Sequence, residues 1–311
     1  MKNKTRLLIL LVTCLIFLVP SLSGEKKTFW SRFSLKFTGG WGSRIPIGDV
    51  NDALKSFNDN EIFQKHRKYN SGLVVGELKT LDDRISHWEA ELKFDLAPRI
   101  SLGIDTSAPI HKHNHSSVTY TLIGQPGPQV MTWTFTPEIR VSYPVRLSAY
   151  YTLPIIRRLS AYIGGGVGFY SARVSEFLRF DEIPPAGGSY WYIRDQVAKQ
   201  KFGLGLHGNV SLQYSITNRF ALLAEFQKRQ IRIGSFEGNL NSRDIYGVSH
   251  EKRGTLYYYT IWDLFVGVRH ADLGIWPDIP EDPFIEIRDI KKATVDLSGY
   301  SIRLGISVRL F

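Results

Sequence analysis

The sequence predicts an all-β fold, namely an eight-stranded up-and-down antiparallel transmembrane β-barrel with long extracellular loops. Three observations lead to this prediction. Eight segments alternate apolar and polar residues with a period of two, short and long connections between them follow in turn, and the chain begins with an export signal. No later stretch approaches the roughly 18 apolar residues that a membrane-spanning helix needs.

The first residues have the organisation of a secretory signal peptide. Three basic residues precede the apolar run Leu7–Val19, and small residues surround a cleavage position after Ser23. We therefore expect a signal peptide over 1–23 and a β-barrel over 24–311. A lipoprotein signal ending at Cys14 is the alternative. Since Cys14 is the only cysteine, the exported chain is expected to contain no disulfide.

The period-two segments predict strands with two unlike faces. In 131–151 the odd-numbered positions are apolar or aromatic throughout, and the even-numbered positions are mostly polar. A tilted strand crosses a bilayer with about 9–11 residues, so this strand and the next should project beyond the membrane. Pro137 and Pro144 remove ladder donors, so we expect bulges there or a shorter strand. The eight predicted strands cover 32–41, 87–96, 99–110, 131–151, 159–170, 202–214, 220–229 and 300–310.

Short and long connections alternate along the chain. An up-and-down barrel with all long loops on one side produces this order, and its strand number is even when both termini lie on the short-turn side. A ten-stranded barrel with two further strands in the last connection is the alternative. The short connections are 97–99, 152–158 and 216–219, and the long ones are roughly 43–84, 111–130, 181–199 and 237–294.

The distribution of charged residues indicates which face of the predicted strands points outward and which points into the barrel. The apolar face almost lacks charge in all eight segments, which suits contact with lipid, whereas a soluble lipocalin-like barrel would turn that face inward. The polar face carries six acidic and seven basic residues that nearly cancel, as a close-packed interior of ion pairs requires. These residues are Lys36, Glu89, Glu91, Lys93, Asp95, Asp105, Glu138, Arg140, Arg146, Glu225, Arg229, Arg303 and Arg309.

We predict that part of this polar face forms a charge network in the barrel interior. Eight strands enclose a space that side chains just fill, so a bonded plug is expected rather than an open pore. The alternative is a narrow channel for small, even hydrophobic, molecules, with space left by the glycines at 164–166, 168, 203 and 205. The predicted network contains Glu89, Glu91, Lys93, Glu138, Arg140, Arg146, Glu225, Arg229 and Arg303.

Aromatic residues on the apolar face predict two girdles, one at each membrane interface. Phe29, Trp30, Tyr151, Tyr214 and Phe220 are expected at the edge near the short turns, and Trp41, Trp88, Trp133, Phe169 and Tyr300 at the opposite edge. With the signal peptide, the eight amphipathic strands, the absence of other cysteines and the terminal strand "DLSGYSIRLGISVRLF", the chain resembles the small outer-membrane β-barrels of the OmpA/OmpX/OmpW-like group. The resemblance is one of architecture and covers roughly 29–311.

The resemblance implies a location in a bacterial outer membrane and assembly by the barrel-assembly machinery, which reads an aromatic last residue such as Phe311. Outer-membrane lipid and lipopolysaccharide are the expected partners. Such lipids also suit the basic balance of 39 Lys and Arg against 29 Asp and Glu, and no nucleic acid is expected as a partner. The sequence does not identify an extracellular ligand.

A short amphipathic helix is predicted within 48–69. Val50, Leu54 and Phe57 recur with helical spacing, Phe63 continues the series, and Asp49 is the expected N-cap. This helix would lie on the membrane, over the barrel mouth, or against neighbouring loops.

The sequence offers one candidate metal-binding motif and one set of candidate catalytic residues. The motif "HKHNH" at 111–115 places three imidazoles that could bind zinc or copper, although a solvated polar loop is the stronger interpretation and no cofactor is predicted. Ser175, His207 and Glu225 are the residues of a possible lipid-modifying enzyme, but no catalytic motif joins them. We therefore expect a non-enzymatic protein, structural or interacting at the surface, with the channel and the enzyme as alternatives.

Overall fold

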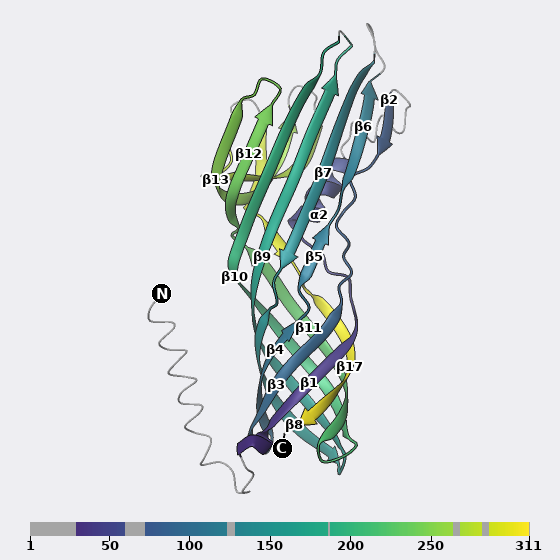
Figure 1. Ribbon diagram of the computed structural model, residues 1–311, viewed down its shortest axis with the longest axis vertical. Coiled ribbons are helices and arrows are strands. Elements are labelled where there is room, and N and C mark those ends of the chain that lie inside the picture. Colours follow the sequence, from purple (N-terminus) through teal and green to yellow (C-terminus); the bar gives the residue numbers. More distant parts are fainter. Residues whose placement is uncertain are drawn as a thin grey trace.

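The computed structural model describes residues 29–59, 72–122, 128–185, 187–263, 268–281 and 286–310. These residues are 73% strand and contain one α-helix, and their strands form a single large antiparallel sheet (Figure 1). This confirms the all-β, antiparallel part of the prediction. No helix within the described ranges is long and apolar enough to cross a membrane. The predicted signal peptide lies outside the described residues.

Eight strands close into a ring at one end of the molecule. Antiparallel pairing runs from each strand to the next, and β1 and β17 close the ring with a register from Ser34↔Arg309 to Gly42↔Ser301. All eight predicted segments contribute to it. In ring order the strands are β1 (Phe33–Gly42), β3 (His87–Ala97), β4 (Ile100–Ser107), β8 (Val145–Ile156), β9 (Leu159–Ile183), β10 (Tyr190–Ser215), β11 (Phe220–Gly234) and β17 (Gly299–Arg309).

The predicted strand 131–151 is two strands, β7 (Gln129–Val141) and β8, because the ladder breaks at 142–144. Pro144 lies in this break, where its missing donor costs no ladder bond. The break also reverses the facing of the alternation. Val141 is 3% exposed, whereas Leu147, another odd-numbered residue, is 40% exposed. The apolar set therefore points inward above the break and outward below it.

Strands β9 and β10 form one long hairpin that rises from the ring (Figure 1). They contain 25 and 26 residues and pair from Tyr190↔Glu182 down to Tyr214↔Leu159, with a bulge between Gln200 and Gly203. The prediction of a long connection over 181–199 was therefore wrong, since most of it is ladder. The expectation that strand five projects beyond the ring agrees with this hairpin.

The upper part of the hairpin carries further strands on both sides. On one side β7 joins β9, followed by β5 (Ile110–His113), β6 (Ser116–Leu122) and β2 (Gly72–Gly76). On the other side β12 joins β10, followed by the strands of the last long connection. These strands lie above the eight-stranded ring and do not enlarge it to ten. They are β12 (Glu237–Asp244), β13 (Ser249–Asp263), β14 (Val268–Trp276), β15 (Glu286–Lys292) and β16 (Thr294–Asp296).

The predicted helix is present as α2 (Asp49–Asn58), preceded in the chain by the short 3₁₀ helix η2 (Phe29–Arg32). Its N-cap is Gly48 rather than Asp49. The Asp49 carboxylate instead accepts hydrogen bonds from the backbone N and the hydroxyl of Thr294, at 2.8 and 3.0 Å. The helix packs on β14 and, through Phe57, on Phe135 of β7, so it lies between strands of the upper part of the molecule. Phe63 falls outside the described residues.

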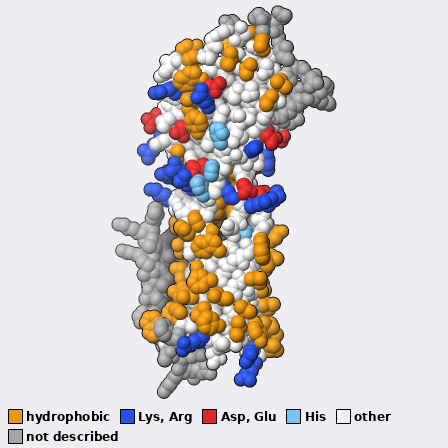
Figure 2. Space-filling model, turned by 45° about the vertical axis from the view of Figure 1, so that its right-hand side comes forward, with side chains coloured by type: hydrophobic (Ala, Val, Ile, Leu, Met, Phe, Trp, Pro, Cys, Tyr) orange, Lys and Arg blue, Asp and Glu red, His pale blue; other side chains and the backbone are white. Residues whose placement is uncertain are grey.

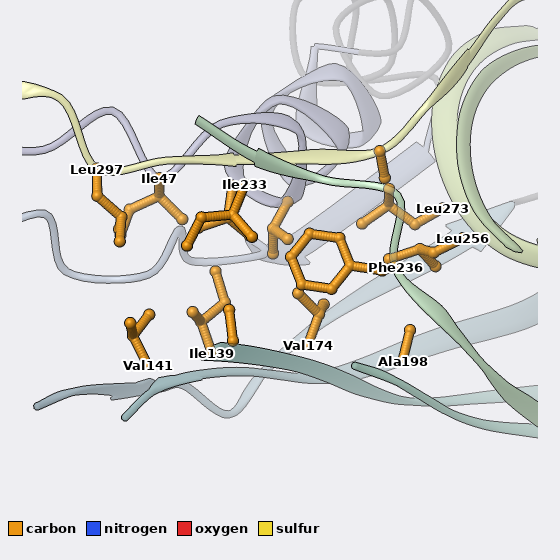
Figure 3. Packing of buried hydrophobic residues seen from close by; sticks show 14 of the residues in the cluster. Ile47, Ile139, Val141, Val174, Ala198, Ile233, Phe236, Leu256, Leu273 and Leu297 are labelled. Carbon is orange, nitrogen blue, oxygen red and sulfur yellow. The ribbon is translucent and has the colours of Figure 1, made fainter. Parts of the chain in front are cut away.

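The molecule has two interiors of opposite character. The upper part encloses an apolar core, in which Ile233 and Phe236 are fully buried and face Ile139 and Val174 (Figure 3). The ring encloses polar and charged side chains. The same inward face of β11 serves both, because it changes from polar residues such as Glu225 to apolar residues at 231 and 233.

Candidate functional site: the ion-paired interior of the ring

Glu89 of β3 lies at the centre of the charges inside the ring. Its Oε1 is 3.3 Å from Lys36 Nζ on β1, and its Oε2 accepts hydrogen bonds from the guanidinium groups of Arg146 and Arg303. These residues belong to four different strands. Each points inward because the period-two alternation places it opposite the exposed apolar set of its strand. One carboxylate therefore connects β1, β3, β8 and β17 across the interior.

Three more carboxylates complete this group, which we call the ring cluster. Lys36 Nζ lies 2.8 Å from Glu91 and 2.6 Å from Glu225. Arg303 also binds Glu225, and Arg146 donates to Asp105. Every charged side chain of the cluster is at most 7% exposed. The ring cluster consists of Lys36, Glu89, Glu91, Asp105, Arg146, Glu225 and Arg303.

Neutral polar side chains surround the ring cluster. Ser148 Oγ lies 2.8 Å from His207 Nε2 and donates to Asp105 at 3.3 Å. Gln227 accepts a 3.5 Å hydrogen bond from Arg146, and Asn209 donates to Tyr150 at 3.4 Å. These contacts help to satisfy buried polar atoms that would otherwise be costly.

The ring cluster fills the section of the interior that it occupies. Above it is a cavity of only about 20 Å³, lined by Arg146, Arg229 and Arg303 among others. The glycines considered as channel-forming residues accommodate side chains instead. A Cβ on Gly164 would lie 2.4 Å from Tyr150, and one on Gly168 would lie 2.7 Å from the Tyr170 ring. Gly164 and Gly168 therefore make room for tyrosine side chains, whereas a Cβ on Gly166 would meet the backbone of Leu147.

Two residues of the predicted network lie elsewhere. Glu138 and Arg140 belong to β7 above the break, where the inward face is apolar, so they point outward and pair with each other. Burial raises the pKa of Glu138, but hydrogen bonds from Arg140, His111 and Ser175 outweigh it and lower this pKa to about 2. Their inclusion in the network was wrong. The inward face changes from the odd-numbered to the even-numbered residues at 142–144, and the sequence pattern alternates in the same way on both sides of this break.

The remaining predicted residues fall into the ring. Glu89, Glu91, Arg146, Glu225 and Arg303 come together in the ring cluster. Lys93 lies below it, with Nζ 3.7 Å from the centre of the Tyr162 ring, and Arg229 lies above it with Nε and Nη2 buried and without hydrogen-bond partners among the described residues.

Lys36 and Asp105 belong to the cluster but were missing from the predicted network, although both share its inward phase. Ser148 and Tyr150 were not named as partners, although the period-two pattern of 131–151 places them on the same face as Arg146. Both stand at even-numbered positions of β8, where they face the interior with Arg146.

The candidate enzyme and metal residues are not brought together. Ser175 donates to Glu138 above the ring, His207 contacts Ser148, and Glu225 is bound by Lys36 and Arg303. His111 and His113 have rings 5.3 Å apart, but His111 contacts Glu138. Within the described ranges no group of three or more His, Cys, Asp or Glu is placed to hold a metal ion.

A second buried ion group lies in the upper part. Arg194 of β10 donates two hydrogen bonds to Asp272, at 2.7 and 2.8 Å, and one to Glu176 at 2.7 Å. One cation thus faces two carboxylates. Burial raises the pKa of Glu176, Asp272 adds to this, and Arg194 opposes it without cancelling it. Burial and Asp272 together therefore disfavour the negative charge of Glu176 more than Arg194 and the other contacts favour it.

Glu176→Gln is expected to stabilise the protein increasingly as the pH rises. The folded state holds the Glu176 proton more tightly than the unfolded chain, so this residue's contribution to stability is present at low pH and lost above the ordinary glutamate pKa. The difference in unfolding free energy between E176Q and the wild type should grow in favour of E176Q between about pH 4.5 and pH 8. Urea titrations at each pH measure it, and exposed Glu237→Gln is the control. A constant or reversed difference would contradict this expectation.

The outside of the ring is apolar. Figure 2 shows hydrophobic side chains covering the lower half and a band of charged groups above them. Nine of the ten predicted girdle residues lie on ring strands or on η2. The side chains of eight of these nine are exposed, with exposed fractions of 41–78%. Trp133 is the exception, since it packs on Phe57 and Phe180 in the upper part. The break in the alternation turns Trp133 inward, while Tyr143, 62% exposed, lies 6.5 Å from Trp88.

Comparisons with known proteins add no identity to these observations. No protein-family model matches the chain, and no curated protein matches its sequence. The function therefore has to be argued from the ring, its interior and its surface.

Proposed function

We propose that the chain is a bacterial outer-membrane β-barrel that is exported by its signal peptide and spans the bilayer with the eight-stranded ring. One observation carries this proposal: the ring has charge inside and a continuous apolar surface outside. Leu204, Leu206 and Leu304 are 58–60% exposed, whereas Arg146, Glu89 and Arg303 are at most 2% exposed. A ring surrounded by water would gain stability from the opposite arrangement.

Strand lengths support the same proposal. β1, β3 and β17 contain 10, 11 and 11 residues, close to the 9–11 or so that a tilted strand needs to cross the hydrocarbon layer. Closure of the ring leaves no unpaired edge in lipid. Above the ring the inward face becomes apolar, as expected where the outside is water.

The role that fits this geometry best is non-enzymatic. The ring cluster closes the barrel against ions, so the barrel serves as an anchor that holds the folded upper part outside the cell. The upper part has its own apolar core and helix, which suits a rigid surface structure with an interaction role.

A row of basic residues above the apolar belt is the proposed contact for lipopolysaccharide. Arg140, Arg173 and Lys199 stand directly opposite one another on β7, β9 and β10. They face outward, because Ile139, Val141, Ala172, Val174 and Ala198 beside them are buried. Like charges opposite one another are unfavourable, and among the described residues Glu138, bound to Arg140, is the one carboxylate that an ion pair joins to this row. Lipid phosphates at the membrane surface supply further anions.

Side-specific labelling tests the proposed topology. Single cysteines replace Tyr246, at the tip of the β12–β13 hairpin, and Asn218, in the turn between β10 and β11 at the other end. In intact cells a membrane-impermeant maleimide should label Y246C, and it should label N218C only after the outer membrane is permeabilised. Labelling of both in intact cells, or recovery of the protein in the soluble fraction, would refute the proposal.

A further inference from the structure

The turn end of the ring contains a polar cavity that the ring cluster does not occupy. Its volume is about 290 Å³. Small inward residues leave this space, among them Ser34, Ala221 and Ser307, and Lys93 and Tyr162 also line it. The cavity is therefore part of the ring interior.

Positive charge dominates this cavity. Five basic residues line it and only one acidic residue, Asp95, which accepts a 2.9 Å hydrogen bond from Ser101. Among the described residues, no ion pair joins any of the five to a carboxylate. In the ring cluster, by contrast, each cation contacts at least two carboxylates. The five basic residues of the cavity are Lys93, Arg157, Arg158, Arg219 and Arg309.

We propose that this cavity is a binding site for a small phosphate-bearing anion. Five unpaired cations around one small space repel one another, and a multiply charged anion between them would turn this repulsion into attraction. Four of them are arginines, whose planar guanidinium forks match the oxygens of a phosphate group. A volume of about 290 Å³ admits a small ligand such as pyrophosphate but no extended chain.

The arginines come from three separate places, which makes the site a property of the closed ring. Arg157 and Arg158 lie in the turn between β8 and β9, Arg219 lies between β10 and β11, and Arg309 ends β17. The register places Arg309 opposite Ser34, beside the closure of the ring. The proposal goes beyond the surface role, because it concerns the end opposite the upper part and holds whether or not that part binds a ligand.

Titration calorimetry on the full chain, folded in a non-ionic detergent at low salt, tests the site. Pyrophosphate is the probe, and inorganic phosphate is expected to bind more weakly because it carries less charge. Arg158→Gln, Arg219→Gln and Arg309→Gln should each weaken pyrophosphate binding on the order of tenfold, since each removes a charged hydrogen bond. Added NaCl should weaken binding further.

Arg99→Gln is the matched control, because Arg99 lies in a turn at the same end of the ring without lining the cavity. It should bind pyrophosphate as the wild type does. Arg158→Lys keeps the charge and should recover part of the affinity. The heat-dependent shift in gel mobility that folded membrane barrels show confirms that each variant is folded.

Competition experiments with lipid micelles identify the source of the phosphate. If micelles containing phosphatidylglycerol displace pyrophosphate and phosphatidylcholine micelles do not, the ligand is a lipid headgroup; if neither displaces it, the ligand is a soluble phosphate. Both results support the site. Absence of pyrophosphate binding at millimolar concentration in low salt, or equal losses in R99Q and R309Q, would overturn it. Either failure leaves the labelling test of membrane topology unaffected.

Discussion

Replacing Glu89 with alanine is expected to lower the unfolding free energy of the ring by about 3–5 kcal/mol. The substitution removes the carboxylate shared by Lys36, Arg146 and Arg303, all buried with side-chain exposures of 2–7%. Their other partners remain, but the cluster changes from four acids and three bases to three of each around an empty centre. The cost therefore reflects the loss of direct contacts and the strong desolvation of the remaining cations.

Urea unfolding of E89A in lipid vesicles, followed by tryptophan fluorescence, measures this loss. Glu138→Ala is the matched control, because Glu138 was predicted for the same network but pairs with Arg140 on the outer surface. The Arg140 side chain is 57% exposed and water can replace part of the lost contacts, so E138A should cost clearly less than E89A. Equal effects of E89A and E138A would show that the ring cluster does not hold the strands together.

The same variant addresses the closed interior. Wild-type protein in a planar bilayer is expected to show no steady unitary current, because the ring cluster occupies the interior and the cavity lined by Arg146, Arg229 and Arg303 has a volume of only about 20 Å³. E89A opens space at the centre and is expected to show brief openings. Steady current from the wild type would favour the channel alternative over the anchor.

Leu304→Arg is expected to destabilise the membrane-inserted protein by about 2–4 kcal/mol. Leu304 lies near the middle of β17, points outward and is 58% exposed. In water an arginine at such a position would be harmless, because surface substitutions usually change stability by less than about 0.5 kcal/mol. In hydrocarbon the guanidinium has to be desolvated or reach the interface, and this produces the cost.

Val248→Arg is the control for this prediction. Val248 is also an exposed apolar residue, at 45%, but it lies at the tip of the β12–β13 hairpin, far along the chain from the ring strands. Its substitution should leave the unfolding free energy unchanged within about 0.5 kcal/mol. Urea unfolding in vesicles compares the two, and equal costs for L304R and V248R would contradict a lipid-facing belt.

The ring strands were predictable because one rule governs them. In β3, β11 and β17 the period-two pattern and the polarity of each face point to the same arrangement, and the structure follows it. The rule fails at 142–144. Alternation reports that a strand has two faces, but which face turns inward depends on whether lipid or water lies outside. The pattern crosses from the polar interior of the ring to the apolar interior of the upper part without losing its period, so Glu138 and Arg140 were assigned to the wrong side.

The strands above the ring were harder to predict for a related reason. β10 changes phase at the bulge between Gln200 and Gly203, which hides the continuity of a 26-residue strand. β12 is rich in polar residues because its outer face meets water, so it lacks an apolar stripe. Part of the ring cluster was predictable from its inward phase. Its bonds were not, because Lys36 reaches Glu225 on a strand that does not pair with β1.

The most direct measurement of the central claim uses nitroxide spin labels on single cysteines at positions 304 and 248 in the vesicle-reconstituted protein. If the ring spans the bilayer, the label at 304 should collide readily with dissolved oxygen and rarely with a water-soluble nickel chelate, and the label at 248 should show the reverse. If the label at 304 meets the nickel chelate as often as the label at 248 does, the apolar belt faces water and the proposed barrel is not in a membrane.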